Sequence, residues 1–114
     1  MDRQERTRLQ GQRIRRARGW LGYTQGELAE KLSAELGDDI SYATISRIEA
    51  GQREVTVQEM RVLVIILQQS REWLEGDDVP FDDRVNPRYL NSLFDYEKVS
   101  RSGEILLQES AIAA

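Results

Sequence analysis

The sequence contains no cysteine and no histidine. Their absence excludes disulfide bridges, thiolate or imidazole metal ligands, and every catalytic arrangement built on either residue. The remaining reactive side chains are scattered along the chain and form no cluster that suggests a nucleophile and its base. We therefore predict no catalytic residue, no metal site, no cofactor and no enzymatic activity.

Long apolar runs are also missing. The longest, from Val62 to Leu67, is far too short to cross a bilayer. The first residues are charged and include no apolar segment of the kind found in signal peptides. We expect a cytoplasmic protein of bacterial or phage origin with no membrane partner. A hydrophobic fraction of 39% over 114 residues suits one modest domain with a small appendage.

The net charge of −4 is unevenly distributed along the chain. Seven arginines precede Trp20, whereas residues 76–114 carry an excess of acidic side chains. Because local fields decide which partners a surface attracts, the basic end is compatible with a nucleic-acid partner despite the negative total.

Helix starts and ends are clearly marked in the first two thirds of the chain. Thr24 and Thr56 are each followed three residues later by a glutamate, which predicts capping boxes. Further caps are predicted at Ser41 and Asn86, and glycines mark helix ends. The predicted helices cover residues 9–21, 25–36, 42–50, 57–67, 71–75 and 87–99.

The same signals divide the chain into three parts. Residues 1–75 are predicted to form one domain, and residues 76–86, which are acidic and lack helical periodicity, an acidic linker. Residues 87–114 are predicted to form a C-terminal helix and tail. Two interpretations of the small, apolar end of the tail stay open, a frayed terminus and a degradation tag.

The stretch SYATISRIEAG, residues 41–51, has two faces when wound as a helix. One face is suited to a core. The other carries a short mixed set of side chains unlike an ordinary solvated surface, namely Tyr42, Ala43, Ser46, Arg47 and Ala50. Two helices joined by a tight turn, with a basic helix ahead of them, is the layout of a helix-turn-helix DNA reader.

Residues 14–76 resemble the phage-repressor and Cro-like helix-turn-helix domain of the Xre family. The matching blocks are IRRAR, TQGELAEKL, ISYATISRIEAG, VTVQEMRVLVIIL and SREWL, in the family's order. The resemblance implies an all-α fold, a five-helix repressor-like helix-turn-helix domain with a C-terminal helical appendage. It also implies double-stranded DNA as the partner.

The resemblance implies roles for individual residues. Arg47 is expected to bond guanine O6 and N7, and Ala43 to meet a thymine methyl group. For Tyr42, contact with a base and contact with a phosphate stay open. The predicted base-reading set is Tyr42, Ala43, Ser46 and Arg47, the predicted phosphate set is Gln25, Arg13, Arg15 and Arg53, and Arg18 and Glu49 are the predicted structural ion pair.

The sequence departs from the family pattern between Leu32 and Ile40, where SAELGDD replaces what is usually a single glycine. The second helix should therefore run a turn longer. Asp38 and Asp39 should then lie near the DNA, where they either repel phosphates or cap the following helix.

Two functions from different classes follow. The first is a sequence-specific transcriptional regulator, a repressor acting as a homodimer on a pseudo-palindromic operator with half-sites about 34 Å apart. The alternative is an antitoxin or adaptor whose acidic C-terminal segment binds a protein partner, with DNA binding for autoregulation.

The predicted helix over residues 57–67 has more apolar residues than one buried face requires. Its surplus implies a second apolar surface that is covered by the predicted C-terminal helix, either within one chain or across a two-fold axis. The predicted dimer or partner interface consists of Val62, Ile65, Ile66, Leu90, Leu93 and Phe94.

Overall fold

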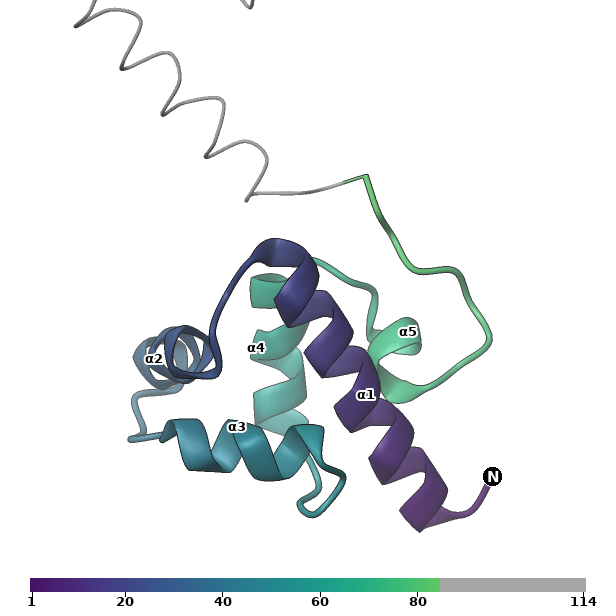
Figure 1. The fold of residues 1–114 in the computed structure, drawn as a ribbon, viewed down its shortest axis with the longest axis horizontal. Coiled ribbons are helices and arrows are strands. Elements are labelled where there is room, and N and C mark those ends of the chain that lie inside the picture. The colour runs from purple at the N-terminus through teal and green to yellow at the C-terminus, as the bar shows by residue number, and fades with distance from the viewer. Residues whose placement is uncertain (85–114) are drawn as a thin grey trace, which may run out of the picture.

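A computed structural model describes residues 1–84 and places five helices in that range (Figure 1). They are α1 (Arg3–Leu21), α2 (Gln25–Leu36), α3 (Tyr42–Glu49), α4 (Val57–Leu67) and α5 (Arg71–Glu75). No strand occurs in the described part, so the predicted all-α fold with a five-helix domain is confirmed. No helix within residues 1–84 is long and apolar enough to span a bilayer. The predicted helix over 87–99, with Leu90, Leu93 and Phe94, lies outside the described residues.

Capping residues explain where the helices begin. The capping boxes predicted at Thr24 and Thr56 are both present, with Glu27 and Glu59 as their partners. Ser41 caps α3, since its hydroxyl accepts a hydrogen bond from the Thr44 N–H. The bounds of α2, α4 and α5 agree with the prediction, and α3 ends one residue earlier than predicted.

The first helix is longer than predicted, because its start signal lies ahead of the apolar pattern. It begins at Arg3 rather than at residue 9. Asp2 and Glu5 form a third capping box, in which each side chain accepts a hydrogen bond from the other residue's backbone N–H, at 2.8 and 3.0 Å. Arginine is among the better helix formers, so the charged first turns are helical without contributing to the core.

The core contains apolar residues from all five helices. The positions predicted to be core on α2, α3 and α4 are all buried except Val64, which is partly buried: Leu28, Ala29, Leu32, Ile45, Ile48, Met60, Leu63, Val64 and Leu67. Each fully buried leucine or isoleucine among them stabilises the fold by roughly 1.5–3 kcal/mol relative to its exposed state. The largest fully buried side chains are Ile14, Leu28, Leu32, Ile45, Ile48, Leu63, Leu67 and Leu74.

The second apolar surface predicted on α4 is smaller than expected. Val62 and Ile66 are partly buried against the core, because they flank Leu63 and Leu67 on the helix surface. Ile65 is 72% exposed. Of the three predicted interface residues on α4, Ile65 alone projects fully from the domain.

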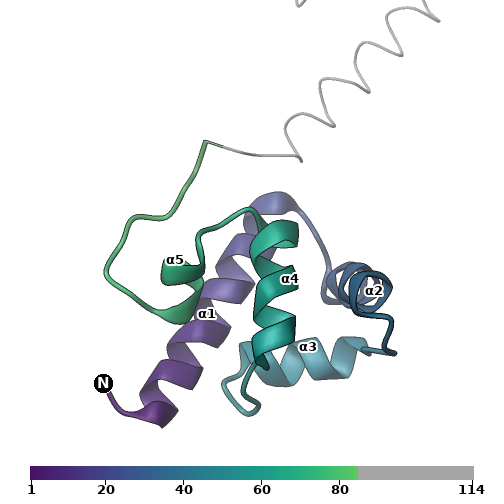
Figure 2. The same ribbon diagram turned by 180° about the vertical axis from the view of Figure 1, so that it is seen from behind.

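Helix α1 lies between α3 on one side and α5 on the other (Figures 1 and 2). On the α3 side, a Cβ atom added at Gly11 would lie 2.2 Å from the carbonyl oxygen of Ile48 and 2.9 Å from that of Glu49. On the α5 side, Leu9 packs closely against Gly76. The missing side chain at Gly11 therefore allows the backbones of α1 and α3 to touch.

Residues 77–84, here termed the strap, pack on the domain, although they were predicted to belong to a linker over residues 76–86. The Phe81 ring makes edge contacts with the rings of Trp73 and Trp20, at centroid distances of 4.9 and 5.5 Å. The sequence does not signal these contacts, because one aromatic side chain in an acidic segment produces no periodic pattern.

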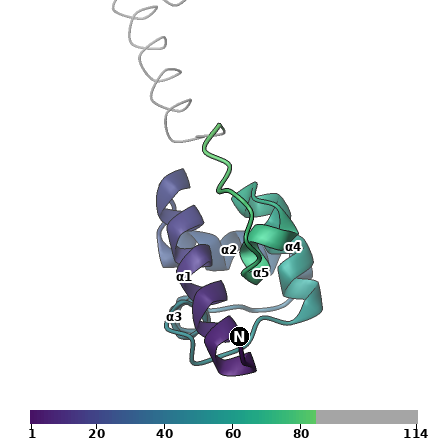
Figure 3. The same ribbon diagram turned by 90° about the vertical axis from the view of Figure 1, so that its right-hand side faces the viewer.

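The strap, the last green segment in Figure 3, begins beside α5 and runs to the end of the domain opposite α3. The turn between α4 and α5 prepares the surface on which the strap packs. In this turn, Gln68 adopts a left-handed conformation with φ of 57°. The next residue, Gln69, is buried. Because the strap ends opposite α3, the last described residues lie on the side of the domain away from that helix.

Candidate nucleic-acid interface

Helices α2 and α3 form a helix-turn-helix unit whose turn is fixed by a serine. The Ser33 hydroxyl accepts a hydrogen bond from the Ile40 N–H at 2.8 Å and lies 3.1 Å from the Ile40 carbonyl oxygen, to which it donates. Figure 1 shows α2 end-on while α3 lies across the page, so the two helices cross steeply. The outer face of α3 is thereby turned away from α2.

The longer second helix ends at Leu36, as predicted, and leaves Asp38 and Asp39 in the turn. Both aspartates are exposed, and within residues 1–84 neither forms a hydrogen bond or an ion pair. Because Ser41 caps α3, the prediction that an aspartate caps this helix is wrong. Two unpaired carboxylates therefore flank the N-terminus of α3.

The two faces of α3 differ as the sequence predicts. Both of its isoleucines are 1% exposed, whereas Tyr42 is 65% exposed and Arg47 is also exposed. Ala43 and Ser46 are half-buried and lie between Tyr42 and Arg47 on the outer face. The structure thus brings the four predicted base-reading residues onto one accessible surface, with Tyr42 and Arg47 projecting furthest.

The Arg47 guanidinium has no acidic partner among the described residues. Its nearest contact is a long hydrogen bond of 3.5 Å from Nη2 to the Thr44 hydroxyl, on the same helix. A neutral contact at this distance holds the side chain weakly. Arg47 therefore keeps its charge and its donors for an external partner.

Arg18 and Glu49 form a bidentate ion pair, with Nε to Oε2 at 2.6 Å and Nη2 to Oε1 at 3.0 Å. Arg18 also donates to the Tyr23 carbonyl at 2.8 Å, and Gln25 donates its amide to Glu49 at 3.0 Å. The Glu49 carboxylate is nearly enclosed, with its residue 8% exposed. This network connects the end of α1, the start of α2 and the end of α3.

Arg53 binds Glu59 through two hydrogen bonds of 2.9 Å each. Burial raises the pKa of Glu59, but the hydrogen bonds from Arg53 and from the backbone near Thr56 outweigh it, so the net direction is down. The arginine thus keeps a buried carboxylate charged at the start of α4. Its guanidinium is engaged inside the chain, and we leave Arg53 out of the phosphate contacts proposed below.

Arg13 lies on the α5 side of α1. Its Nη1 donates to the carbonyl oxygens of Trp73 and Asp77, at 2.6 and 2.8 Å, and its guanidinium lies over the Trp73 ring. This side of α1 is opposite the residues that contact α3. We therefore assign Arg13 a structural role and also leave it out of the proposed phosphate contacts.

Two of the seven N-terminal arginines, Arg8 and Arg15, differ from the others because they have no partner within the described residues. Both are exposed, and neither forms a hydrogen bond, ion pair or ring contact there. At about 100° per residue, both lie within roughly 60° of Gly11, on the side of α1 that faces α3. The arginines that have partners inside the chain are Arg3, Arg6, Arg13, Arg16 and Arg18.

Arg8 was not among the predicted site residues. Its signal in the sequence is the spacing of seven residues from Arg15, which places both on one helix face with Gly11 between them. The backbone and the aliphatic part of Arg8 pack against Gly51, in the loop that follows α3. Arg8 therefore lies beside the end of α3.

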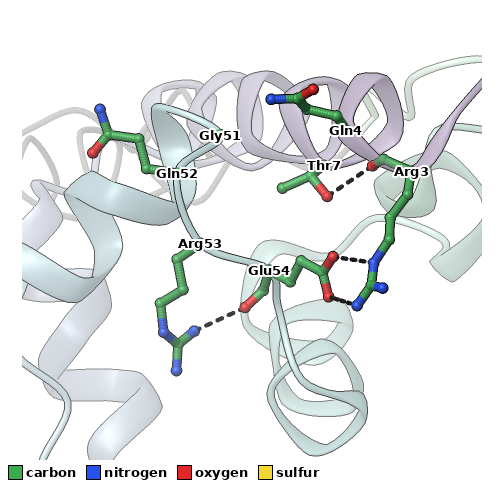
Figure 4. A pocket seen from close by; sticks show the side chains of 7 residues that line it. All are labelled: Arg3, Gln4, Thr7, Gly51, Gln52, Arg53 and Glu54. Carbon is green, nitrogen blue, oxygen red and sulfur yellow. Dashed lines mark hydrogen bonds and ion pairs between the residues drawn. The ribbon is translucent and has the colours of Figure 1, made fainter.

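A shallow pocket lies between the first turns of α1 and the loop that connects α3 to α4 (Figure 4). Arg3 and Glu54 form a bidentate ion pair on one side of it, and Arg53 donates to the Glu54 carbonyl. The Arg3 hydrogen bond lowers the pKa of Glu54. Gln4 and Gln52 turn away from this ion pair, so the pocket is a polar junction between α1 and the loop.

A family model described as helix-turn-helix matches residues 14–74. The matched range contains the α2–turn–α3 unit, the Arg18–Glu49 pair and the core of the domain. No curated protein and no solved structure is significantly similar to the chain.

Proposed function

The chain belongs to the Cro/Xre-type helix-turn-helix family of DNA-binding transcription regulators, and we propose that it is a repressor that binds its operator as a homodimer. A helix-turn-helix domain binds DNA and is not a catalytic unit, and we propose no enzymatic role for the rest of the chain. The observation that supports the proposal most directly is α3, whose accessible face carries an unpaired arginine. The protein would act on the nucleoid, in the cytoplasm.

In this proposal α3 lies in the major groove and reads base edges. The Arg47 guanidinium bonds guanine O6 and N7 together, since it has no competing carboxylate. Tyr42, in the first turn of α3, reaches a base or a phosphate through its hydroxyl. Ala43 and Ser46 lie between these two residues on the same face, and their short side chains contact base edges directly beneath α3.

Phosphates would be held on both sides of α3. The backbone N–H groups in the first turn of α2, at Gln25 and Gly26, have no partner within the helix and form the positive end of its dipole. The Gln25 amide already binds Glu49, so its backbone is the better candidate for this contact. Arg8 and Arg15 would hold the phosphates beside the end of α3.

A homodimer would place two copies of α3 about one helical turn of DNA apart, roughly 34 Å. We propose that Ile65, with the flanking Val62 and Ile66, contributes to the subunit interface together with residues 87–114. The same segment is the proposed site for a protein partner, as in the antitoxin or adaptor alternative. Sedimentation velocity on the full chain, alone and with DNA, measures the subunit number directly.

Arg47→Ala should weaken operator binding by about 1–3 kcal/mol and relax the base preference at one position of each half-site. The physical reason is the loss of two hydrogen bonds to one base pair. Selection of bound sequences from a random duplex pool, before and after the substitution, measures both effects. Arg61→Ala is the control, since it removes an equal charge from an exposed site on α4. An equal loss of affinity on operator and random DNA would exclude Arg47 as a base-reading residue.

Arg15→Ala should reduce the steepness of log affinity against log salt by about one. One fewer phosphate is neutralised in the complex, so about one fewer counterion is released on binding. Arg13→Ala should leave this slope unchanged, since Arg13 is bound to α5 and the strap. Titrations of labelled operator DNA at several salt concentrations give the slopes. Equal reductions for the two variants would show that the basic face as a whole, and not its α3 side, meets the DNA.

A further inference from the structure

The strap is attached to the domain by an aromatic cluster. Phe81 contacts both Trp73 on α5 and Trp20 at the end of α1, and no other tryptophan occurs in the sequence. The Arg16 guanidinium lies 4.3 Å from the centroid of the Phe81 ring, on a third side. A cation at this distance from an aromatic face is attracted to it. Phe81 therefore joins the strap to α1 and α5 together.

A buried glutamine provides a second attachment. The Gln69 side chain donates to the Asp82 carbonyl at 2.8 Å and accepts from the Asp82 N–H at 2.9 Å. The amide thus pairs with the strap backbone as a neighbouring peptide group would, and it is enclosed, with Gln69 only 5% exposed. If the strap left, this amide would lose both of its partners, so the two hydrogen bonds favour the docked strap.

The start of the strap is attached to the arginines on the same side of α1. Arg13 donates to the Asp77 carbonyl at 2.8 Å, and Arg6 lies 3.6 Å from the Asp77 carboxylate. These contacts, with those of Arg16, extend along more than two turns of α1. The strap and α5 therefore support one whole side of this helix.

The opposite side of α1 holds the DNA-reading helix in place. Gly11 touches the last carbonyl groups of α3, and Arg18 binds Glu49 at the end of that helix. In a helix with about 3.6 residues per turn, residues 11 and 18 project opposite residues 6, 13 and 16. A shift of α1 away from the strap therefore moves the support of α3.

We propose that the strap is a conformational latch for DNA binding. When it is docked, α1 is held against α3 and the helix-turn-helix unit keeps its binding geometry; when it is released, α1 loosens and DNA affinity falls, although no strap residue contacts DNA. A partner that pulls on the segment after Arg84 would thereby weaken operator binding. The inference rests on the proposed role of α3 as the reading helix.

The test uses the full chain with Phe81→Ala. Since both tryptophans contact Phe81, their fluorescence emission should shift to longer wavelength as water reaches them. Circular dichroism should show that the helices persist, and operator affinity should fall about five- to tenfold, at the lower end of ordinary coupling between sites. Val79→Ala is the matched control, because Val79 is a strap residue that belongs neither to the aromatic cluster nor to the Gln69 contact.

Two results would overturn the proposal. Unchanged emission would mean that the strap is not held by Phe81, and changed emission with unchanged affinity would mean that the strap is not coupled to α3. If Phe81→Ala lowers the helical signal, the same measurements on Phe81→Leu, which keeps an apolar contact, decide between the outcomes. If the unmodified chain fails to bind any selected DNA, the proposed function fails, while the emission still reports whether the strap is docked.

Discussion

Gly11→Ala is expected to lower the free energy of unfolding by about 2–3 kcal/mol, at the upper end of the range for overpacked sites. The added methyl group would meet the carbonyl oxygens of Ile48 and Glu49, at 2.2 and 2.9 Å. Because both are backbone atoms, no side-chain rotation relieves the clash, and α1 must move away from α3. The gain in helix propensity from alanine, about 1 kcal/mol, is smaller than this cost. Urea unfolding followed by circular dichroism measures the change.

Gly19→Ala is the control for this substitution, because Gly19 is on the same helix and a Cβ atom there has no neighbour within 4 Å. It should stabilise the domain by up to about 1 kcal/mol through helix propensity alone. Operator binding should be weakened by Gly11→Ala and unchanged by Gly19→Ala. If both substitutions stabilise the protein equally, then the close contact between α1 and α3 does not exist in solution.

Arg18→Leu is expected to destabilise the domain by about 3–5 kcal/mol, the cost of leaving one member of a buried pair without the other. Glu49 would keep only the Gln25 amide, and the Tyr23 carbonyl would lose its donor. DNA binding should fall with stability, since the same network sets the start of α2 against the end of α3. Chemical denaturation gives the stability, and operator titration under conditions where the variant is folded gives the binding.

The double variant Arg18→Leu, Glu49→Leu separates the net contribution of the ion pair from the cost of leaving one buried charge unpaired. Replacing both charges by apolar side chains should recover most of the stability lost in the single variant. Arg71→Leu is a further control, since it breaks an exposed pair with Glu75 and should cost no more than about 0.5 kcal/mol. A small effect of Arg18→Leu, similar to that of Arg71→Leu, would show that the Arg18–Glu49 pair is effectively exposed.

The sequence predicted the helices of the domain well, because their start and stop signals are local. A threonine with a glutamate three residues later needs no tertiary contact to act as a capping box, and the bounds of α2 and α4 followed from such pairs. The core positions followed from the helical spacing of apolar residues, which is also a local signal. The first helix was the exception, because its capping box at Asp2 is followed by charged and polar residues and the apolar pattern begins only at Leu9.

The candidate site was less predictable, because the sequence does not show which partner each charged residue has. Arg13 and Arg15 are two residues apart and looked alike in the sequence, yet one binds α5 and the other is free within the described chain. The partner of Arg13 is about sixty residues away, and only the packing of α1 against α5 brings the two together. The packing of the strap was missed for the same reason, since its attachments are to α1, to α5 and to Gln69 in the turn between α4 and α5.

The internal pairing of the N-terminal arginines has a consequence for the kinetics of target search. Sliding along non-specific DNA depends on phosphate contacts, and each contact lengthens the time that a protein stays on a wrong sequence. This domain offers few unpaired arginines beside α3 and places two carboxylates at the α2–α3 turn. It should therefore leave non-specific DNA quickly and find its operator mainly by repeated dissociation and rebinding, with short sliding distances between encounters.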